Sequence, residues 1–156
     1  MELDRDFSEF IESCVAHEVR FLIVGGYAVA VHGHPRFTKD LDVWVWIDPQ
    51  NADRLVAALA DFGFGSLGLR AADFLEEGMV VQLGHPPKRI DLLTSVDGVE
   101  FETCWERRVD VTLGSQVVPF LSAADLIANK RASGRPQDIA DVAVLEDTRE
   151  GELGGN

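Results

Sequence analysis

The chain has 156 residues, 46% of them hydrophobic, which is enough to bury one core and predicts a single domain. Its 14 Lys and Arg residues face 27 Asp and Glu residues, and the formal charge of −13 argues against binding of extended DNA, because cationic side chains hold a phosphate backbone. The sequence has no apolar run of about 18 residues and no signal-peptide pattern, so no membrane association is expected. Cys14 and Cys104 lack metal-ligand spacing, and two thiols without a disulfide framework predict the reducing cytoplasm.

Helical and strand patterns alternate along the chain. In chain order we expect a helix at 7–19, a strand at 21–24, a short helix at 27–32, a strand at 40–47, a helix at 49–62, a short helix at 70–77, strands at 79–83 and 89–93, a short helix at 101–108, strands at 109–113 and 116–121, and helices at 122–133 and 136–145. Ser122 is expected to cap one of these helices. The tail at 147–156 is expected to be disordered.

Two glycines follow the first apolar strand. Gly25 and Gly26 stand between the apolar run 21–24 and the helical segment 27–32. Glycines at a strand-to-helix turn let backbone N–H groups approach a phosphate, and the helix N-terminus adds partial positive charge. A tight turn that needs a positive φ would explain the same pair, so the glycines alone do not specify a phosphate site.

Two aspartates, Asp40 and Asp42, open the next predicted strand. Side chains two residues apart on a strand point the same way, so these carboxylates would repel one another unless a cation lay between them. Mg²⁺ is the usual cation for carboxylates that share it with substrate phosphates. Solvated turn residues are the alternative. The apolar residues on both faces of the strand favour the metal interpretation, because a covered central strand seldom ends in two charges without a function.

Two β-hairpins are expected later in the chain, at 79–93 and 109–121. In the first, Asp91 stands between two apolar neighbours and would face away from both. If its strand lies beside that of the first acid pair, three carboxylates converge, as in two-metal phosphoryl-transfer sites. An edge-strand acid that faces water is the alternative.

Charges of both signs mark the last two predicted helices. Lys130 ends one of them, and Asp138 and Asp141 begin the next. The helix dipole alone favours cations at a C-terminus and acids at an N-terminus, so this pattern has a structural explanation as well as a functional one.

Several other polar and aromatic residues are expected to be structural. His32 should pack or form a hydrogen bond at the end of its helix, because no His/Cys spacing supports a zinc site. Lys39 should point to solvent. The tryptophans Trp44, Trp46 and Trp105 are expected in the core or at an interface rather than stacked on a base.

The combination of glycines and acids resembles the polymerase-β-like nucleotidyltransferase superfamily. That superfamily has a Gly-Gly or Gly-Ser turn before a helix, Asp-x-Asp on the next strand and a third acid on a later strand, which are GGYAVAVHG, DLD and RIDLL in this chain. The chain is similar in particular to a small bacterial branch, whose pattern is matched here by Gly25, Gly26, Ala28, His32, Gly33, Arg36, Thr38, Asp40 and Asp42. This branch includes minimal nucleotidyltransferases, abortive-infection toxins and small aminoglycoside or lincosamide adenylyltransferases. Gly26 departs from many active members, which carry a Ser there.

The resemblance implies an α+β fold at 1–146, with helices packed mainly on one side of a mixed β-sheet. It also implies roles for individual residues. Asp40, Asp42 and Asp91 would be the catalytic metal ligands, and Asp91 would also serve as general base. The nucleotide-binding residues would be Gly25, Gly26, Arg36, Thr38, Lys130 and Asp138, with Asp138 orienting Lys130 or Arg36.

The implied reaction is a Mg²⁺-dependent transfer of an NMP from an NTP to an acceptor, with release of pyrophosphate and with Mn²⁺ as a substitute metal. The acceptor is open and would be a small molecule, a protein or tRNA. The alternatives are a toxin of a toxin–antitoxin pair, an enzyme that adenylylates a cationic antibiotic, and a catalytically degenerate domain that binds a nucleotide or a partner. A homodimer is one arrangement that would complete the site.

Overall fold

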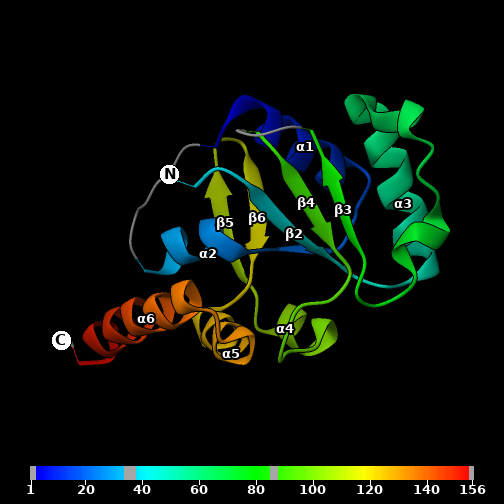
Figure 1. The fold of residues 1–156 in the computed structure, drawn as a ribbon. Helices are drawn as coiled ribbons and strands as arrows, with labels where there is room; N and C mark the ends of the chain where they lie inside the picture. Colours follow the sequence, from blue (N-terminus) through cyan, green and yellow to red (C-terminus); the bar gives the residue numbers. More distant parts are fainter. Residues whose placement is uncertain (1–2, 34–37, 85–87, 155–156) are drawn as a thin grey trace.

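The apolar runs of the sequence form the strands of one central sheet. The structure, a computed structural model, describes residues 3–33, 38–84 and 88–154 (Figure 1). The strands in these residues are β1 (Phe21–Val24), β2 (Leu41–Val45), β3 (Val80–Leu83), β4 (Ile90–Leu93), β5 (Val109–Leu113) and β6 (Gln116–Phe120). The α-helices are α1 (Arg5–Ala16), α2 (Gly25–His32), α3 (Pro49–Leu59), α4 (Phe101–Glu106), α5 (Ala123–Ser133) and α6 (Pro136–Gly154).

The strands form one mixed sheet in the order β3-β4-β2-β1-β6-β5. At its centre, β1 runs antiparallel to β2 and parallel to β6, and β2 runs parallel to β4. The hairpin predictions are confirmed, because β3 pairs with β4 and β5 pairs with β6 in antiparallel fashion. The predicted α+β fold with a mixed sheet is therefore confirmed.

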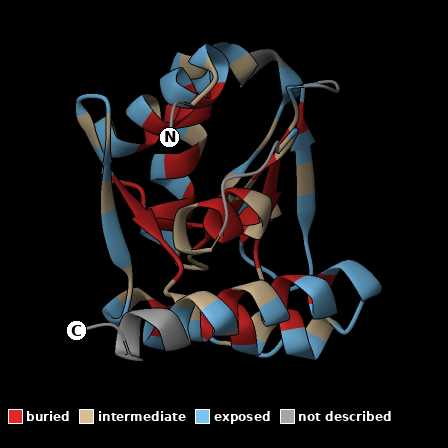
Figure 2. Cartoon of the chain, turned by 90° about the vertical axis from the view of Figure 1, so that its left-hand side faces the viewer, coloured by how far each residue is buried: buried red, intermediate tan, exposed pale blue. Residues whose placement is uncertain are grey.

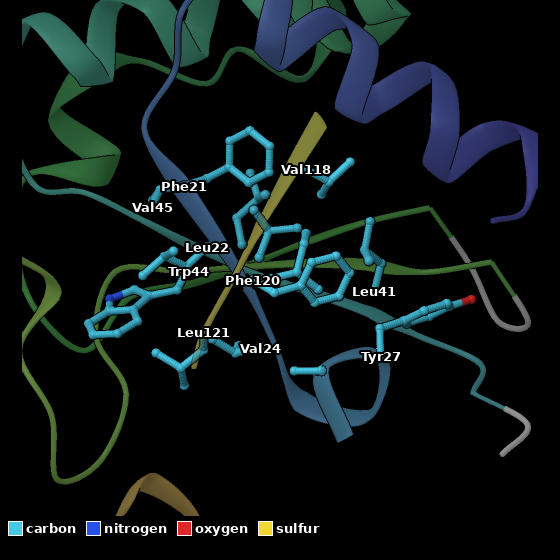
Figure 3. Close-up of a cluster of buried hydrophobic side chains, with 14 of the residues drawn as sticks. Phe21, Leu22, Val24, Tyr27, Leu41, Trp44, Val45, Val118, Phe120 and Leu121 are labelled. Carbon is cyan, nitrogen blue, oxygen red and sulfur yellow. The ribbon is translucent and has the colours of Figure 1, made fainter. Parts of the chain in front are cut away.

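The central strands are covered on both faces. In the close-up of the core, Phe21 and Val118 point toward α1 and α3, whereas Trp44 and Leu121 point to the other side (Figure 3). On that second side Trp44 meets Phe101 of α4 edge to face, with ring centroids 5.1 Å apart. Helices thus lie on both faces of the sheet rather than mainly on one, because strands that are apolar on both sides need two covering layers. Figure 2 shows the buried residues gathered in this middle layer and on the inward sides of the helices.

Local sequence signals set most helix boundaries. Ser122 caps α5 as predicted, since its side chain accepts a hydrogen bond from the backbone nitrogen of Asp125 at 3.2 Å. The helix α3 ends at Leu59, before the expected boundary, and gives way to irregular helical turns in which Gly63 has a φ of 107°. Helix α6 continues past Leu145 to Gly154 and so enters the segment for which disorder was expected. No Gly or Pro interrupts the chain between 146 and 150, which allows this continuation.

Two further features concern membrane-spanning segments and thiols. Within the described residues, no helix has both the length and the apolar character needed to cross a membrane. Cys14 and Cys104 are both buried and carry free thiols.

Candidate active site

Asp42 and Asp91 lie side by side on neighbouring strands. The register of the parallel β2–β4 pair places them directly opposite one another. Asp40 stands two residues before Asp42, just ahead of β2, so strand alternation directs both side chains to the same face. The predicted adjacency of the strand of Asp91 and the strand of the acid pair is confirmed. It depends on the position of β4 between β2 and β3, which excludes the edge-strand alternative for Asp91.

Arg89 lies between two of these carboxylates, and the sequence analysis did not identify it. Its Nε donates to Oδ1 of Asp91 at 2.9 Å, and one terminal nitrogen donates to Oδ2 of Asp91 at 3.1 Å. The same terminal nitrogen donates to Oδ2 of Asp40 at 3.0 Å. The hydrogen bonding with Asp91 raises the pKa of Arg89, which therefore remains a cation. A usable signal was present in the sequence, because Arg89 precedes Asp91 by two residues and hence shares its strand face.

The donor atoms of these acids fit a hard divalent cation. Carboxylate oxygens are the ligands that Mg²⁺ prefers. In the part of the chain that the structure describes, however, no three His, Cys, Asp or Glu side chains are already grouped so that they could hold a metal ion. The guanidinium group of Arg89 instead pairs with oxygens of Asp40 and Asp91 that a cation would use.

The carboxyl group of Asp42 has unusual electrostatics. Its burial and the negative charges of Asp91 and Asp40 raise its pKa to about 6. The positive charges of Lys130 and Arg89 act in the opposite direction but do not cancel this effect. Burial and like charges destabilise the anionic form of Asp42. A cation that binds beside this carboxylate therefore stabilises it more than it would stabilise an ordinary surface acid, so Asp42 is suited to be a metal ligand.

The strand β1 passes into α2 without an intervening loop. Val24 ends the strand, and the helix begins at Gly25, which has a φ of 65°, rather than at Tyr27 as expected. No side chain caps this helix start, so the first backbone N–H groups of α2, including that of Gly26, have no helical acceptor. A helix N-terminus of this kind is a favourable place for a phosphate group.

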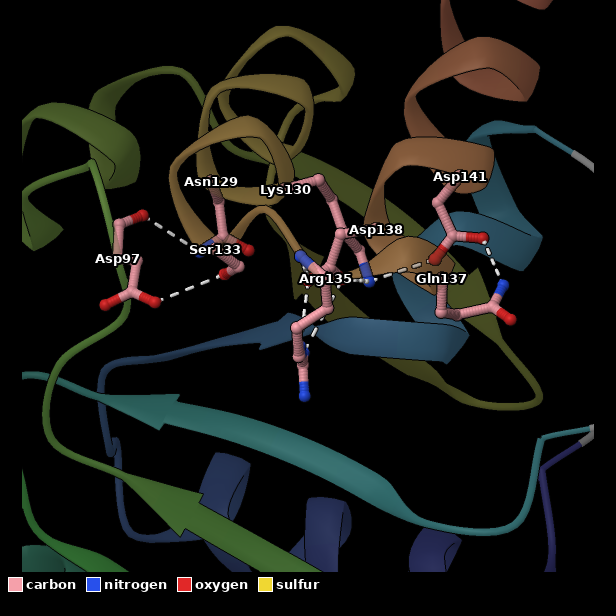
Figure 4. A network of polar contacts seen from close by, with 8 residues as sticks. All are labelled: Asp97, Asn129, Lys130, Ser133, Arg135, Gln137, Asp138 and Asp141. Carbon is pink, nitrogen blue, oxygen red and sulfur yellow. Dashed lines mark hydrogen bonds and ion pairs between the residues drawn. The ribbon is translucent and has the colours of Figure 1, made fainter.

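Lys130 of α5 is a buried cation held by two carboxylates of α6 (Figure 4). Its Nζ lies 3.2 Å from Oδ1 of Asp138 and 3.1 Å from Oδ2 of Asp141. Burial alone would raise the pKa of Asp138, but hydrogen bonds from Arg135 and Lys130 outweigh burial and hold that pKa below its usual value. The predicted contact between Asp138 and Lys130 is confirmed, and Asp141 shares the same cation.

One cavity, of about 200 Å³, is lined by both Asp42 and Lys130. Its walls come from the start of α2, from β2, from the segment after β4 and from the ends of α5 and α6 that face each other, and they include Gly25, Asp42, Asp97, Asn129, Lys130 and Arg135. Asp97 fixes the segment after β4 to α5, since its backbone oxygen accepts from Asn129 and its carboxylate accepts from Ser133 (Figure 4). The sequence analysis assigned no function to Arg135, and it did not identify Asp97 or Asn129, because these two form no recognisable motif along the chain.

Four other residues singled out in the sequence are Arg36, Thr38, Lys39 and His32. Arg36 lies outside the described residues. The backbone oxygen of Thr38 accepts a hydrogen bond from the hydroxyl of Tyr27 at 3.4 Å, which places Thr38 just ahead of the acids. Lys39 is exposed, as predicted. Nε2 of His32 donates to the backbone oxygen of Leu121 at 2.7 Å, which confirms its predicted structural role.

The tryptophans lie away from the acids. Trp44 is buried in the core, and Trp46 and Trp105 both stack with Phe101, with ring centroids 6.5 and 5.9 Å apart. Trp46 follows the end of β2, whereas Asp42 lies near its start. A larger cavity, of about 560 Å³, opens beside these rings, but the convergent acids and cations are at the other end of the strand. We therefore take the smaller cavity as the candidate active site.

The fold and the convergent acids define a polymerase-β-like nucleotidyltransferase. A family comparison supports this assignment, since one family model matches residues 1–146. The chain belongs to that family, described as nucleotidyltransferases of unknown function (DUF6036). The membership in the nucleotidyltransferases that the motifs predicted is therefore confirmed. A comparison with curated proteins found no match.

Solved structures with the same fold cover nearly the whole chain. The lincosamide antibiotic adenylyltransferase LnuA, solved with lincomycin bound, is 12% identical with a TM-score of 0.56, and the match covers 94% of this chain and 98% of that one. TM1012 of Thermotoga maritima, provisionally described as a nucleotidyltransferase, is 13% identical with a TM-score of 0.56 and coverage of 98% and 97%. An antigenic nucleotidyltransferase-like protein from Paracoccidioides brasiliensis is 15% identical with a TM-score of 0.52 and coverage of 92% and 74%. At these identities the likeness establishes the fold.

Proposed function

We propose that this protein transfers an NMP from an NTP to an acceptor hydroxyl or phosphate group, with release of pyrophosphate, in a reaction that depends on Mg²⁺ or Mn²⁺. One observation carries the proposal, namely that acids from β2 and β4, the start of α2 and a buried lysine of α5 converge on a single region. Acids for a metal, N–H groups for phosphates and a cation for the remaining charge are the parts that nucleotidyl transfer requires.

The acids have a shared role and one separate role in this proposal. Asp40, Asp42 and Asp91 hold the metal, which offsets negative charge at the α-phosphate when bound. Asp91 also accepts the proton of the acceptor hydroxyl, for which its position opposite Asp42 on the neighbouring strand is suited.

The triphosphate is held mainly from the other side of the cavity. The N–H groups of Gly25 and Gly26 face its phosphates at the start of α2. Lys130 adds a positive charge whose position Asp138 fixes. Arg135 also lines the cavity, and its exposed guanidinium group is free to turn toward a phosphate from its contact with Asp138. Arg36 and Thr38 complete the proposed nucleotide contacts.

A small-molecule acceptor is the first class to test. The basis is the LnuA structure, which was solved with an antibiotic bound and matches almost the full length of both chains. Lincosamides are therefore the first acceptors to screen. Aminoglycosides follow, because the branch that the chain resembles includes enzymes that adenylylate them. The screen uses a reducing buffer that suits the proposed cytoplasmic location. Growth arrest on induced expression would instead favour the toxin-type activity on tRNA or protein.

A domain that binds nucleotide without turnover is the second candidate. It is favoured by Gly26, which has no hydroxyl to contact a phosphate, and by the pairing of Asp40 and Asp91 with Arg89. Mg²⁺-dependent NTP binding without pyrophosphate release would identify this case.

The test is isothermal titration of the purified chain with each NTP, with and without Mg²⁺, beside the Asp40→Ala/Asp42→Ala double variant. We expect binding that requires Mg²⁺ and is lost in the variant, followed by pyrophosphate release once an acceptor is present. Absence of binding to every NTP would reject the proposal. Light scattering on the same samples tests whether the chain forms a homodimer, the arrangement that would complete the site.

A further inference from the structure

Arg89 pairs with two of the three acids at the positions where a metal would bind. Its guanidinium group forms two hydrogen bonds with Asp91 and one with Asp40, all between 2.9 and 3.1 Å. The side chains of Arg89 and Asp40 are 28% and 32% exposed, whereas that of Asp91 is 11% exposed. The bridge is therefore partly screened by solvent and can open without unfolding of the sheet.

We infer that Arg89 is a built-in competitor of the divalent cation, which binds Asp40 and Asp91 only after the Arg89 bridge opens. This inference rests on the proposed function, since it assigns a regulatory contact to the same site. The guanidinium group donates hydrogen bonds to the carboxylate oxygens that a metal ion would bind, and two cations at one place repel each other, so the two compete. Metal affinity is consequently weaker than the three acids alone would provide.

The electrostatics of the site support a counter-charge role rather than a purely structural one. The charges of all three acids, together with the hydrogen bonds to Asp91, raise the pKa of Arg89. In return, Arg89 offsets part of the repulsion that acts on Asp42, a residue to which it makes no hydrogen bond. One guanidinium group thus offsets negative charge on Asp40, Asp42 and Asp91 together.

Arg107 provides a matched control elsewhere in the chain. Its guanidinium group binds the carboxylate of Asp125 through two hydrogen bonds of 3.1 and 2.6 Å, and neither residue lines the cavity beside the acids. Removal of Arg107 therefore breaks a two-point Arg–Asp pair of the same chemistry without touching the proposed metal ligands.

The test measures Mn²⁺ binding to the full chain by electron paramagnetic resonance of free Mn²⁺. We expect Arg89→Gln to bind Mn²⁺ about two- to fivefold more tightly than the wild type, the ratio that corresponds to loss of a partly exposed ion pair. Arg107→Gln should bind Mn²⁺ as the wild type does. A second readout is the melting temperature, which Mn²⁺ should raise further in Arg89→Gln than in the wild type or in Arg107→Gln.

Two results would overturn the inference. Unchanged or weaker Mn²⁺ binding by Arg89→Gln, while the wild type binds Mn²⁺ and Asp42→Asn does not, would leave the proposed function standing and reject the competition. Absence of Mn²⁺ binding by the wild type and by Arg89→Gln would reject both. If Arg89→Gln does not fold, Arg89→Lys decides, because its single ammonium group cannot bridge two carboxylates in the same way and should also permit tighter Mn²⁺ binding than the wild type.

Discussion

Gly25 lies directly against Asp42, so that a Cβ atom at Gly25 would come within 2.1 Å of Oδ2 of Asp42 and 2.9 Å of its Cγ. The glycine thus performs two functions at once. Its φ of 65° allows β1 to turn straight into α2, and its lack of a side chain leaves the space that the Asp42 carboxylate fills. The position of a proposed metal ligand is therefore coupled to the turn that presents the helix N-terminus.

Gly25→Ala should reduce stability and displace Asp42. The left-handed backbone conformation costs an alanine about 1–2 kcal/mol, and the steric overlap adds about 1–3 kcal/mol. Gly114→Ala is a matched control, since Gly114 has a φ of 62° but no atom within 4 Å of an added Cβ. Urea unfolding should show the larger decrease in the free energy of unfolding for Gly25→Ala. Mn²⁺ titration should show weaker binding for that variant alone. Equal effects of the two substitutions would contradict the steric coupling.

Asp42→Asn should abolish nucleotidyl transfer and yet stabilise the metal-free protein at neutral pH. The folded-state pKa of Asp42, about 6, lies above the unfolded value of 3.8, so wild-type stability falls as the pH rises from about 4 to about 6. The ionised residue then costs up to about 3 kcal/mol, which asparagine avoids.

Melting temperatures at pH 4.5 and 7.5 check this expectation. The advantage of Asp42→Asn over the wild type should be larger at pH 7.5 than at pH 4.5. An advantage that does not depend on pH would show that the pKa of Asp42 is not raised. Substantial residual turnover in the variant would remove Asp42 from the metal site.

Lys130→Met should destabilise the fold strongly. It leaves the buried carboxylates of Asp138 and Asp141 without their shared cation, a change that costs about 3–5 kcal/mol when a buried pair is broken. Arg131→Met is the control, because Arg131 neighbours Lys130 but forms an exposed pair with Glu146, for which a loss below about 1 kcal/mol is expected. Urea unfolding of both variants measures the difference, and a similar small loss in each would mean that the buried cation contributes little.

Trp105→Leu should leave nucleotide affinity unchanged. Trp105 stacks with Phe101 and lies beneath the guanidinium group of Arg108, whose carbon is 4.1 Å from the ring centroid. This cluster is at the opposite end of β2 from Asp42, so the substitution should reduce stability by about 1–3 kcal/mol through lost packing. Isothermal titration with NTP and Mg²⁺ checks the affinity. A loss of binding in a folded variant would instead identify Trp105 as a platform for the base.

The sequence predicted the elements that depend on local pattern. The strand Phe21–Val24, both hairpins and the Ser122 cap follow from apolar runs, turn residues and a capping side chain, all of which act over a few positions. The side-by-side position of Asp42 and Asp91 was inferred from a resemblance, because no local pattern reveals which strands become neighbours.

The contacts that the sequence analysis missed depend on three-dimensional proximity or on competition between signals. Arg89 shares a strand face with Asp91, but its bond to Asp40 exists only because β4 pairs with β2. The hydrogen bonds between Asp97 and α5 likewise join segments that are distant along the chain. The start of α2 at Gly25 was missed because glycine is a poor helix former, and the tertiary fit to Asp42 overrides that preference.

The parallel pairing of β2 with β4 also has a consequence for how the chain folds. Between Asp42 and Asp91 in sequence lie α3, the irregular turns and β3, so the two acids meet only when a long-range strand pair has formed. Non-local pairing of this kind is slow compared with helix formation. During refolding from urea, the far-UV circular dichroism of the helices should therefore recover before the ability to bind Mn²⁺, which makes the metal a reporter of sheet completion.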